Sequence, residues 1–199
     1  MLTKLKEKVQ SWIATEAKLA HSIGLTPNRV SALGMIFAAF SAVAYAYAHL
    51  HLLILAAAPI FLLVSGFCDA LDGAIARIHR KTTTFGKFLD SVLDRIADAA
   101  VLSGIIIGGL CDLRWGFVAL VGSLMVSYAR ARAEALGVEM EGVGVAERAE
   151  RLIILAVASF LSLIWLETLP WAVIVLALLS SLTVLQRMIY FLRASKSRE

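Results

Sequence analysis

The chain has 199 residues, of which 60% are hydrophobic and only 17% charged, and its mean hydropathy is +0.82. This composition excludes an ordinary soluble domain of the same length. The formal net charge is +4, but the basic residues lie between apolar runs, which indicates an anionic membrane surface rather than nucleic acid. Apolar runs recur along most of the sequence, so we expect a single membrane domain over residues 1–199.

The first 24 residues predict an amphipathic helix. Apolar side chains recur at helical spacing, and three lysines fall largely on other faces; the apolar residues are Leu2, Leu5, Val9, Trp12 and Ile13. A basic helix with one apolar stripe is typical of the membrane interface. Packing on the protein's own polar face is an equal alternative. We expect no cleavable leader, because the first long apolar run begins only near Val30.

Six membrane-crossing helices are predicted within residues 26–193, since about 20 residues suffice to cross a bilayer. Thr26 is the expected N-cap and Pro27 the first helical residue, and Pro59 should bend the second helix. The predicted spans are residues 26–50, 52–78, 86–110, 113–136, 145–166 and 170–192. The predicted fold class is therefore an all-α integral membrane protein.

The distribution of basic residues predicts how these spans are oriented. Of 19 lysines and arginines, the short connections on one side hold only Arg114. By the positive-inside rule, the other side faces the cytoplasm, together with both termini. Trp115, Trp165 and Trp171 fall at the opposite interface, as an aromatic belt requires. We therefore expect a multi-pass cell-membrane protein.

Four aspartates interrupt two of the apolar runs. Asp69 and Asp72 lie in FCDALDGAIAR, and Asp90 and Asp94 lie in GKFLDSVLDR. Each carboxylate near hydrocarbon costs roughly 2.5–3.5 kcal/mol unless it is compensated, and divalent cations supply that compensation. Spacings of three and four place each pair on one helix face. A short connection makes the two helices neighbours, so we predict a cytoplasmic metal-dependent site suited to displacement at phosphorus.

Other interpretations of these acids remain open. A divalent-cation transporter is one, because acids within a membrane often mark ion routes. Ion pairs could neutralise the acids without metal, namely Asp72 with Arg77 and Asp90 and Asp94 with Lys87 and Arg95. Asp98 continues the series and has either a supporting role at the site or a structural pairing with Arg95. Cys68 is interpreted as a packing residue.

The pattern Asp69-x-x-Asp72-Gly73-x-x-Ala76-Arg77, eight residues, Gly86-x-x-x-Asp90-x-x-x-Asp94 resembles the complete signature of the CDP-alcohol phosphotransferases. The six spans, the amphipathic leader and the Leu25-Thr26-Pro27-Asn28 start of the first span resemble this family along the whole chain. The resemblance implies that an alcohol hydroxyl attacks the lipid-linked β-phosphate of a CDP-lipid and releases CMP. It also implies a homodimer.

The resemblance assigns roles residue by residue. Asp69, Asp72, Asp90 and Asp94 would bind two divalent cations, Mg²⁺ or Mn²⁺, and Asp94 would also be the general base. The CDP pocket would comprise Asp69, Gly73, Ala76, Arg77 and Gly86. The chemistry requires a base within reach of the hydroxyl, although spacing does not select Asp94 for that role.

Arginines near the cytoplasmic ends of the later spans point to a phosphorylated acceptor, because arginine matches phosphate geometry. They occur in SYARARAEALG and GVAERAERLI, with another on the last span. These phrases resemble the branch that makes phosphatidylinositol phosphate in actinobacteria and archaetidylinositol phosphate in archaea. The resemblance implies an inositol phosphate acceptor bound by Arg130, Arg148, Arg151 and Arg187. Helical pairs with acids, Arg130 with Glu134 and Glu147 with Arg151, could instead use some of these charges.

Two further alternatives concern the substrate. Glycerol-3-phosphate as acceptor, giving phosphatidylglycerol phosphate, is the nearest rival. A prenyl-transferring enzyme with Asp-rich motifs is weaker, because Gly73, Ala76, Arg77 and Gly86 fit the CDP signature. The donor, CDP-diacylglycerol or CDP-archaeol, stays open.

Overall fold

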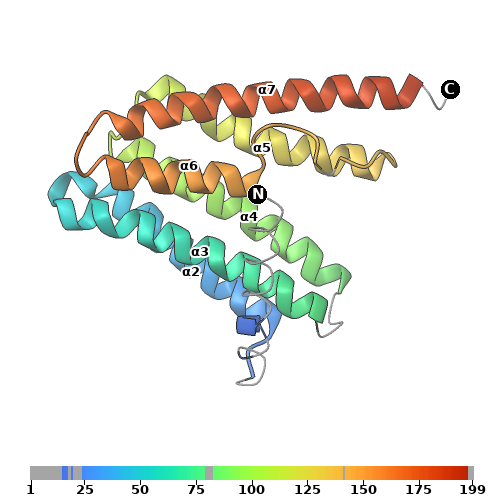
Figure 1. Ribbon diagram of the computed structural model, residues 1–199, viewed down its shortest axis with the longest axis horizontal. Helices are drawn as coiled ribbons and strands as arrows, with labels where there is room; N and C mark the ends of the chain where they lie inside the picture. Colours follow the sequence, from blue (N-terminus) through green and yellow to red (C-terminus); the bar gives the residue numbers. More distant parts are fainter. Residues whose placement is uncertain (1–14, 18, 20–23, 79–82, 141, 197–199) are drawn as a thin grey trace.

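The computed structural model describes residues 15–17, 19, 24–78, 83–140 and 142–196 (Figure 1). From residue 24 onward, the regular structure of the described residues consists of six α-helices and one short 3₁₀ helix. They are α2 (Pro27–Ala46), η1 (Ala48–Leu50), α3 (Leu52–Ile78), α4 (Thr84–Ile107), α5 (Leu113–Ala135), α6 (Arg148–Leu161) and α7 (Thr168–Lys196). The all-helical prediction is confirmed for this part of the chain.

The first two predicted helices begin where expected. Thr26 has the extended backbone of an N-cap and Pro27 opens α2, while α3 has the predicted bounds and contains Pro59. The first helix ends at Ala46 rather than at residue 50, and η1 follows it. A helix continuing to residue 50 would leave one residue for the reversal into α3, so the intervening residues form a turn instead.

The starts of α4 and α5 are set by side-chain caps. Thr83 Oγ1 accepts a hydrogen bond from the Gly86 amide at 2.9 Å, so α4 begins two residues before the predicted start. Asp112 Oδ1 accepts from the Arg114 amide at 3.0 Å at the start of α5. In each case the cap satisfies an amide that has no partner inside its helix.

The prediction for the fifth span was wrong in its bounds. The helix α6 has 14 residues, which is about 21 Å and less than the roughly 30 Å of hydrocarbon. Tertiary contacts hold the preceding residues as a loop, because the Ala146 amide donates to Thr183 Oγ1 of α7 at 3.2 Å. Gly144 has φ of +119°, and a Cβ there would lie 2.3 Å from Thr183 Cγ2. A helix starting at residue 145 would break this contact.

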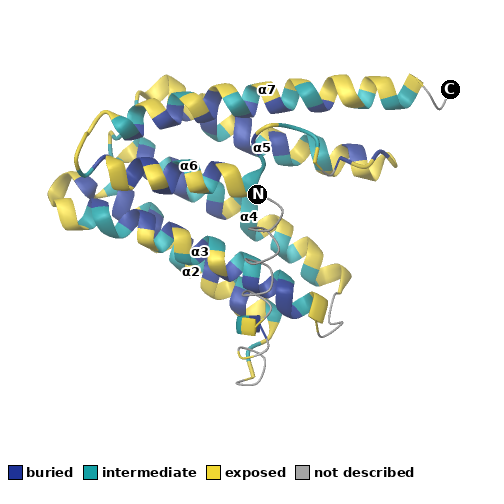
Figure 2. Ribbon diagram, in the orientation of Figure 1, coloured by how far each residue is buried: buried dark blue, intermediate teal, exposed yellow. Residues whose placement is uncertain are grey.

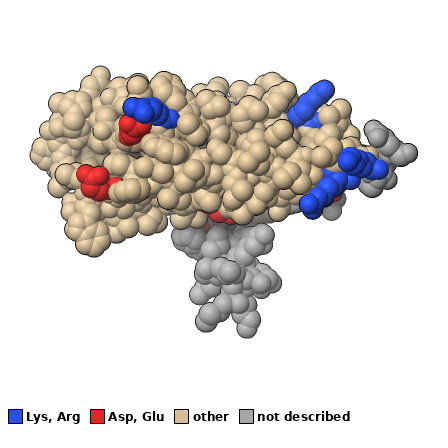
Figure 3. Space-filling model, turned by 90° about the horizontal axis from the view of Figure 1, so that it is seen from above, with Lys and Arg blue, Asp and Glu red and all other residues tan. Residues whose placement is uncertain are grey.

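Three helices, α2, α3 and α7, are long and apolar enough to cross a membrane. The count of six crossings stays a prediction, because α6 is short and α4 carries several charges in its first half. Figure 3 shows the face over α7 almost free of charged side chains, which gather toward the two ends of the molecule. This distribution is typical of a surface in contact with lipid.

The helix α2 organises the half of the molecule that carries the aspartates. Both α3 and α4 pack on α2, while α5 packs on α7 and α6 on both α3 and α7 (Figure 1). Glycine permits the α2–α4 contact, because a Cβ on Gly104 would lie 2.2 Å from the Ala42 carbonyl oxygen. Small residues at such crossings are typical of membrane helices. Among the described residues, the main buried cluster includes residues of α2 to α7, and a second one near the aspartates joins α2 and α3 (Figure 2).

The predicted interfacial helix lies mostly outside the described residues. Residues 15–17 and 19 are helical, and Ala17 is buried against Val30, Leu71 and Ala74. This short part therefore packs on α2 and α3. The rest of the prediction for residues 1–24 is not tested.

Candidate active site

Three aspartates from two helices converge. Asp69 and Asp72 on α3 and Asp90 on α4 each place one carboxylate oxygen so that all three oxygens lie within 4.8 Å of one another. In the described part of the chain, α3 and α4 pack on α2 rather than closely on each other. Carboxylates this close repel one another unless a cation lies among them. Several carboxylate oxygens are the ligands that Mg²⁺ and Mn²⁺ prefer, so these residues fit a divalent cation.

Asp72 is the most deeply buried member, with 5% of the residue exposed. The Ser31 hydroxyl of α2 donates a hydrogen bond to Asp72 Oδ2. The sequence offered no signal for Ser31, because no local spacing relates residue 31 to residue 72. The contact exists only because α3 crosses α2 at this point.

Asp94 lies one turn along α4 from Asp90 but is joined to the others through an arginine. Arg148 Nη1 is 2.9 Å from Asp94 Oδ1 and 2.6 Å from Asp69 Oδ2. We refer to Asp69, Asp72, Asp90 and Asp94 as the acidic site. The ion pairs considered from sequence, with Arg77, Lys87 and Arg95, are not formed among the described residues. The compensating charge comes instead from α6.

The acidic site lines a cavity of about 20 Å³. Its wall also includes Ser31 and Gly34 of α2, Ser65 of α3 and Arg148 of α6. A space of this size holds one or two species as small as water. It therefore suits ions, and a nucleotide must lie on the more exposed surface beside it.

That surface carries the other residues of the family signature. Gly73 lies beneath Arg77, because a Cβ on Gly73 would lie 3.3 Å from Arg77 Nη1. A Cβ on Gly86 would lie 3.0 Å from Thr83 Oγ1 and 3.7 Å from Asn28 Oδ1, so a side chain there would press on the cap of α4. Ala76 adds only a methyl group on this end of α3. The small residues at positions 73, 76 and 86 therefore add little bulk to this surface, and Arg77 lies over Gly73.

Asp98, whose role the sequence left open, connects two arginines of α6. Its Oδ1 lies 3.2 Å from Arg148 Nε and its Oδ2 lies 2.9 Å from Arg151 Nη2. Arg151 is 4% exposed and also donates to the Ala146 carbonyl at 3.1 Å. The alternative pair of Arg151 with Glu147 is not formed in the described part of the chain, because Arg151 contacts Asp98 of α4 instead.

Arg187 of α7 is buried and bonded mainly to backbone. It donates to the Val126 carbonyl at 2.6 Å and to the Val143 carbonyl at 2.8 Å, and its Nη2 lies 3.7 Å from Glu147 Oε1. It therefore ties α5 and the loop before α6 to α7.

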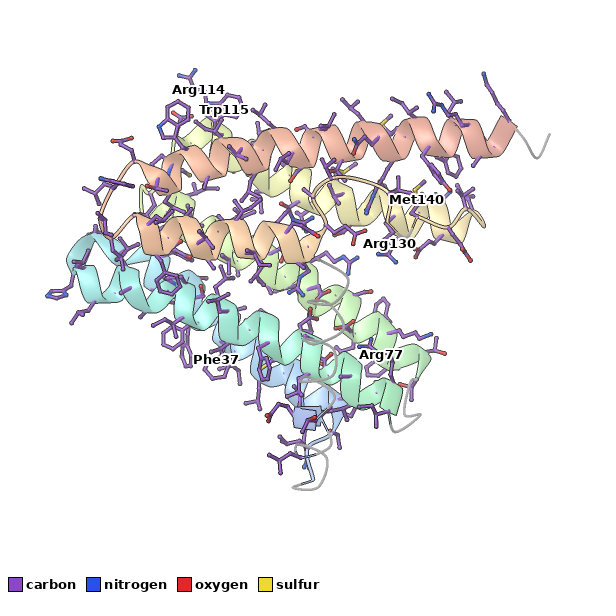
Figure 4. The ribbon with its side chains drawn as sticks, in the orientation of Figure 1. Phe37, Arg77, Arg114, Trp115, Arg130 and Met140 are labelled. Atoms are coloured by element: carbon purple, nitrogen blue, oxygen red, sulfur yellow. The ribbon has the colours of Figure 1, made fainter. Side chains whose placement is uncertain are left out.

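Arg130 forms the predicted helical pair with Glu134 at 2.8 Å. Arg130 and Arg151 both interact electrostatically with Arg187. The four predicted arginines, Arg130, Arg148, Arg151 and Arg187, therefore form one basic area, here termed the arginine region, which adjoins the acidic site through Arg148. Figure 4 shows Arg77 and Arg130 toward one end of the bundle and Arg114 with Trp115 toward the other.

Comparison with known proteins agrees with this arrangement. Residues 24–182 match the family model described as CDP-alcohol phosphatidyltransferase. The chain is 40% identical over 189 residues to archaetidylinositol phosphate synthase of Pyrococcus horikoshii, covering 94% of both chains. It is 36% identical over 181 residues to phosphatidylinositol phosphate synthase of Mycolicibacterium smegmatis, covering 86% of this chain and 79% of the relative.

Solved structures show the same fold. The crystal structure of phosphatidylinositol phosphate synthase from Mycobacterium tuberculosis with CDP-DAG bound has a TM-score of 0.79 and 31% identity, covering 90% of this chain and 92% of that chain. The same enzyme in complex with manganese and citrate has a TM-score of 0.78, covering 90% and 88%. Because the signature acids converge in this structure and the match extends over most of its length, the chain belongs to the CDP-alcohol phosphatidyltransferase family.

Proposed function

We propose that the protein transfers the phosphatidyl or archaetidyl group of a CDP-lipid to a hydroxyl of inositol phosphate and releases CMP, as a step of phospholipid synthesis. The observation that carries the proposal is the convergence of the Asp69, Asp72 and Asp90 oxygens within 4.8 Å, beside Asp94. The names of the relatives support the lipid and acceptor classes.

The acidic site would hold two divalent cations, Mg²⁺ or Mn²⁺, through Asp69, Asp72, Asp90 and Asp94. When bound, such ions would offset the charge that develops on the phosphate oxygens. The three converging carboxylates fit such ions, and the manganese complex of the relative supports the assignment.

The CDP group would lie against the end of α3 and the start of α4. Its contacts would be Asp69, Gly73, Ala76, Arg77 and Gly86. The exposed Arg77 fork suits a phosphate, and because Gly73 has no side chain, the Arg77 guanidinium can lie close to the backbone of α3.

Asp94 would act as the general base. Its carboxylate borders the same cavity as the other acids. It would take the proton of the acceptor hydroxyl while that oxygen bonds to the lipid-linked β-phosphorus. The bond from this phosphorus to the bridging oxygen then breaks, and the oxygen leaves with CMP. A positioned base of this kind contributes about 10²–10⁴-fold to rate.

The arginine region would bind the acceptor's phosphate through Arg130, Arg148, Arg151 and Arg187. The three helices α5, α6 and α7 contribute these guanidinium groups, each beside an acid, and several guanidinium groups together match the geometry of a phosphate. Glycerol-3-phosphate carries the same group, so the region favours a phosphorylated acceptor without choosing between the two.

The protein is a multi-pass membrane protein. We propose in addition that residues 1–199 form one domain with six crossings, that both termini and the acidic site face the cytoplasm, and that the protein is a homodimer. The placement of Arg114 and Trp115 toward the end of the bundle opposite Arg77 and Arg130 supports the orientation (Figure 4). Labelling intact cells that express the protein with one cysteine would test it, either the native Cys111 after Cys68 is replaced, or a cysteine added at the C-terminus after both native cysteines are replaced.

An acceptor panel tests the proposed function. Purified protein in detergent receives CDP-diacylglycerol or CDP-archaeol, with inositol phosphate, glycerol-3-phosphate, inositol or serine, and CMP release is measured. We expect release with inositol phosphate that stops with EDTA and resumes with Mn²⁺ or Mg²⁺. Release only with glycerol-3-phosphate would reassign the acceptor. Divalent-cation flux into proteoliposomes without any CMP release would make the protein a transporter.

A further inference from the structure

Arg148, the first residue of α6, contacts three carboxylates at once. Its Nη1 lies 2.6 Å from Asp69 Oδ2 and 2.9 Å from Asp94 Oδ1, and its Nε donates to Asp98 Oδ1 at 3.2 Å. These acids belong to α3 and to two successive turns of α4. One guanidinium therefore bridges the two helices that carry the acidic site.

Two of these contacts use carboxylates that the proposed function assigns to divalent cations. A guanidinium nitrogen and a metal ion compete for the same oxygens, and two cations placed side by side repel each other. Without a metal ion, Arg148 offsets the repulsion among the carboxylates. With a metal ion bound, its charge opposes the new ligand. The inference rests on the proposed function in this one respect, that Asp69 and Asp94 are cation ligands.

We propose that Arg148 is an exchangeable counter-cation of the acidic site. It neutralises Asp69 and Asp94 before a divalent cation binds, and the cation displaces its Nη1 from both. The contact from Nε to Asp98 keeps the displaced guanidinium beside the site. Loading of the metal therefore frees guanidinium donors for an incoming anion.

The surroundings of Arg148 are suited to this exchange. Its side chain borders both the cavity at the acidic site and an adjoining cavity of about 30 Å³ that Asp98 and Arg151 line. A guanidinium released from Asp69 and Asp94 remains next to Arg151, where the proposed function places the acceptor's phosphate. Binding of the cation and binding of the phosphate consequently favour each other.

In this exchange, Asp98 is a positioning residue, because it holds the Arg148 guanidinium beside the acidic site. Its second oxygen is held by Arg151, which is almost fully buried and fixed by the Ala146 carbonyl. Asp98 therefore stays in place when the other partners of Arg148 change. Asp69 and Asp94 exchange Arg148 for the cation, whereas Asp98 keeps its contact with Arg148.

Mn²⁺ binding to the EDTA-treated full-length protein, followed by electron paramagnetic resonance of free Mn²⁺ without substrates, tests the exchange. The Arg148→Gln variant should bind Mn²⁺ about tenfold more tightly than the wild type, because no charge-assisted contact has to be broken first. Arg148→Lys keeps the positive charge at this position, so it provides a second test if Arg148→Gln does not fold. It should shift the affinity in the same direction but less, because one ammonium cannot span three carboxylates.

Arg95→Gln is the matched control. Arg95 follows Asp94 on α4, but its guanidinium donates to the Ser91 carbonyl. A general effect of positive charge would tighten Mn²⁺ binding equally in Arg95→Gln and Arg148→Gln, which would overturn the exchange. Unchanged or weaker binding in Arg148→Gln would overturn it as well. Either result leaves the proposed function standing if the wild type still releases CMP with inositol phosphate.

Asp98→Asn tests the tether. We expect the acceptor KM to rise about tenfold with the CDP-lipid KM unchanged, because a neutral amide holds a guanidinium less strongly than a carboxylate does. Asp98→Glu, which restores the charge, should recover part of the loss. A merely structural role would raise both KM values together, and that result would remove Asp98 from the tether.

Discussion

The acidic site and the arginine region lie side by side, yet they satisfy their charges in opposite ways. Within the described residues, Asp72 and Asp90 make no ion pair, and their oxygens converge with one of Asp69. The buried arginines donate mainly to protein acceptors, Arg151 to an acid and a carbonyl and Arg187 to two carbonyls. Half of the acidic site therefore lacks a partner of opposite charge, since only Asp69 and Asp94 contact Arg148, whereas the buried arginines already have acceptors.

This difference shows how the two regions should bind their ligands. Converging carboxylates gain strongly from an added cation, because the cation removes their mutual repulsion. An arginine that already donates to carbonyls is held in place, and it gives up or shares existing bonds when an anion arrives. Changes in the acidic site should therefore affect the rate of the reaction, and changes in the arginine region should affect acceptor affinity.

The largest expected effect concerns Asp94. Asp94→Asn should lower kcat about 10²–10⁴-fold, because the amide cannot accept the hydroxyl proton as a base. CDP-lipid binding should remain largely intact, since the converging oxygens belong to the other three aspartates. Single-turnover CMP release together with a CDP-lipid binding isotherm provides the measurement. Near-normal turnover would remove Asp94 from the base role and weaken the contrast between the two regions.

Arg151 tests a buried part of the arginine region. Arg151→Ala should raise the acceptor KM about tenfold to a hundredfold, since a lost charge-assisted hydrogen bond costs roughly 1.5–3 kcal/mol. The CDP-lipid KM should change much less, and Arg187→Ala should show the same split. Arg114→Gln at the other end of the bundle is the control for a general loss of charge. Equal rises of both KM values would place these arginines outside the acceptor site.

Ser31 tests whether support from α2 matters to the acidic site. Ser31→Ala removes the hydroxyl that donates to Asp72, and loss of such a supporting contact typically weakens metal affinity about 10–100-fold. We expect a loss of metal affinity near the lower end of this range, because the backbone of α3 still holds Asp72 in position. A Mn²⁺ titration of the variant measures the change. Wild-type affinity would show that the carboxylates orient without help from α2.

The smallest effect is expected at Arg130. Its pair with Glu134 is exposed, with 39% of the Arg130 side chain accessible, and such pairs contribute about 0–1 kcal/mol. Arg130→Gln should therefore leave the thermal midpoint nearly unchanged and raise the acceptor KM only about threefold. If Arg130→Gln raised the acceptor KM as much as Arg151→Ala does, the exposure of an arginine in this region would not predict its contribution to acceptor binding.

Several features were determined by the sequence alone. The bounds of α3 and the start of α2 followed from a continuous apolar run and from a Thr-Pro cap. The placement of Asp69 and Asp72 on one face of α3 followed from helical spacing. Local rules suffice for these features, because each depends on residues close together in the chain.

Other features depended on the tertiary structure. Arg148 meets Asp69 across 79 positions and Ser31 meets Asp72 across 41, and no periodicity predicts such contacts. The short α6 resulted from hydrogen bonds of its preceding loop to α7, although the apolar pattern favoured a longer helix. The sequence identified the charged residues of the site, but the partner of each charge was decided by how the helices cross. A side chain at a crossing bonds to whatever the neighbouring helix presents.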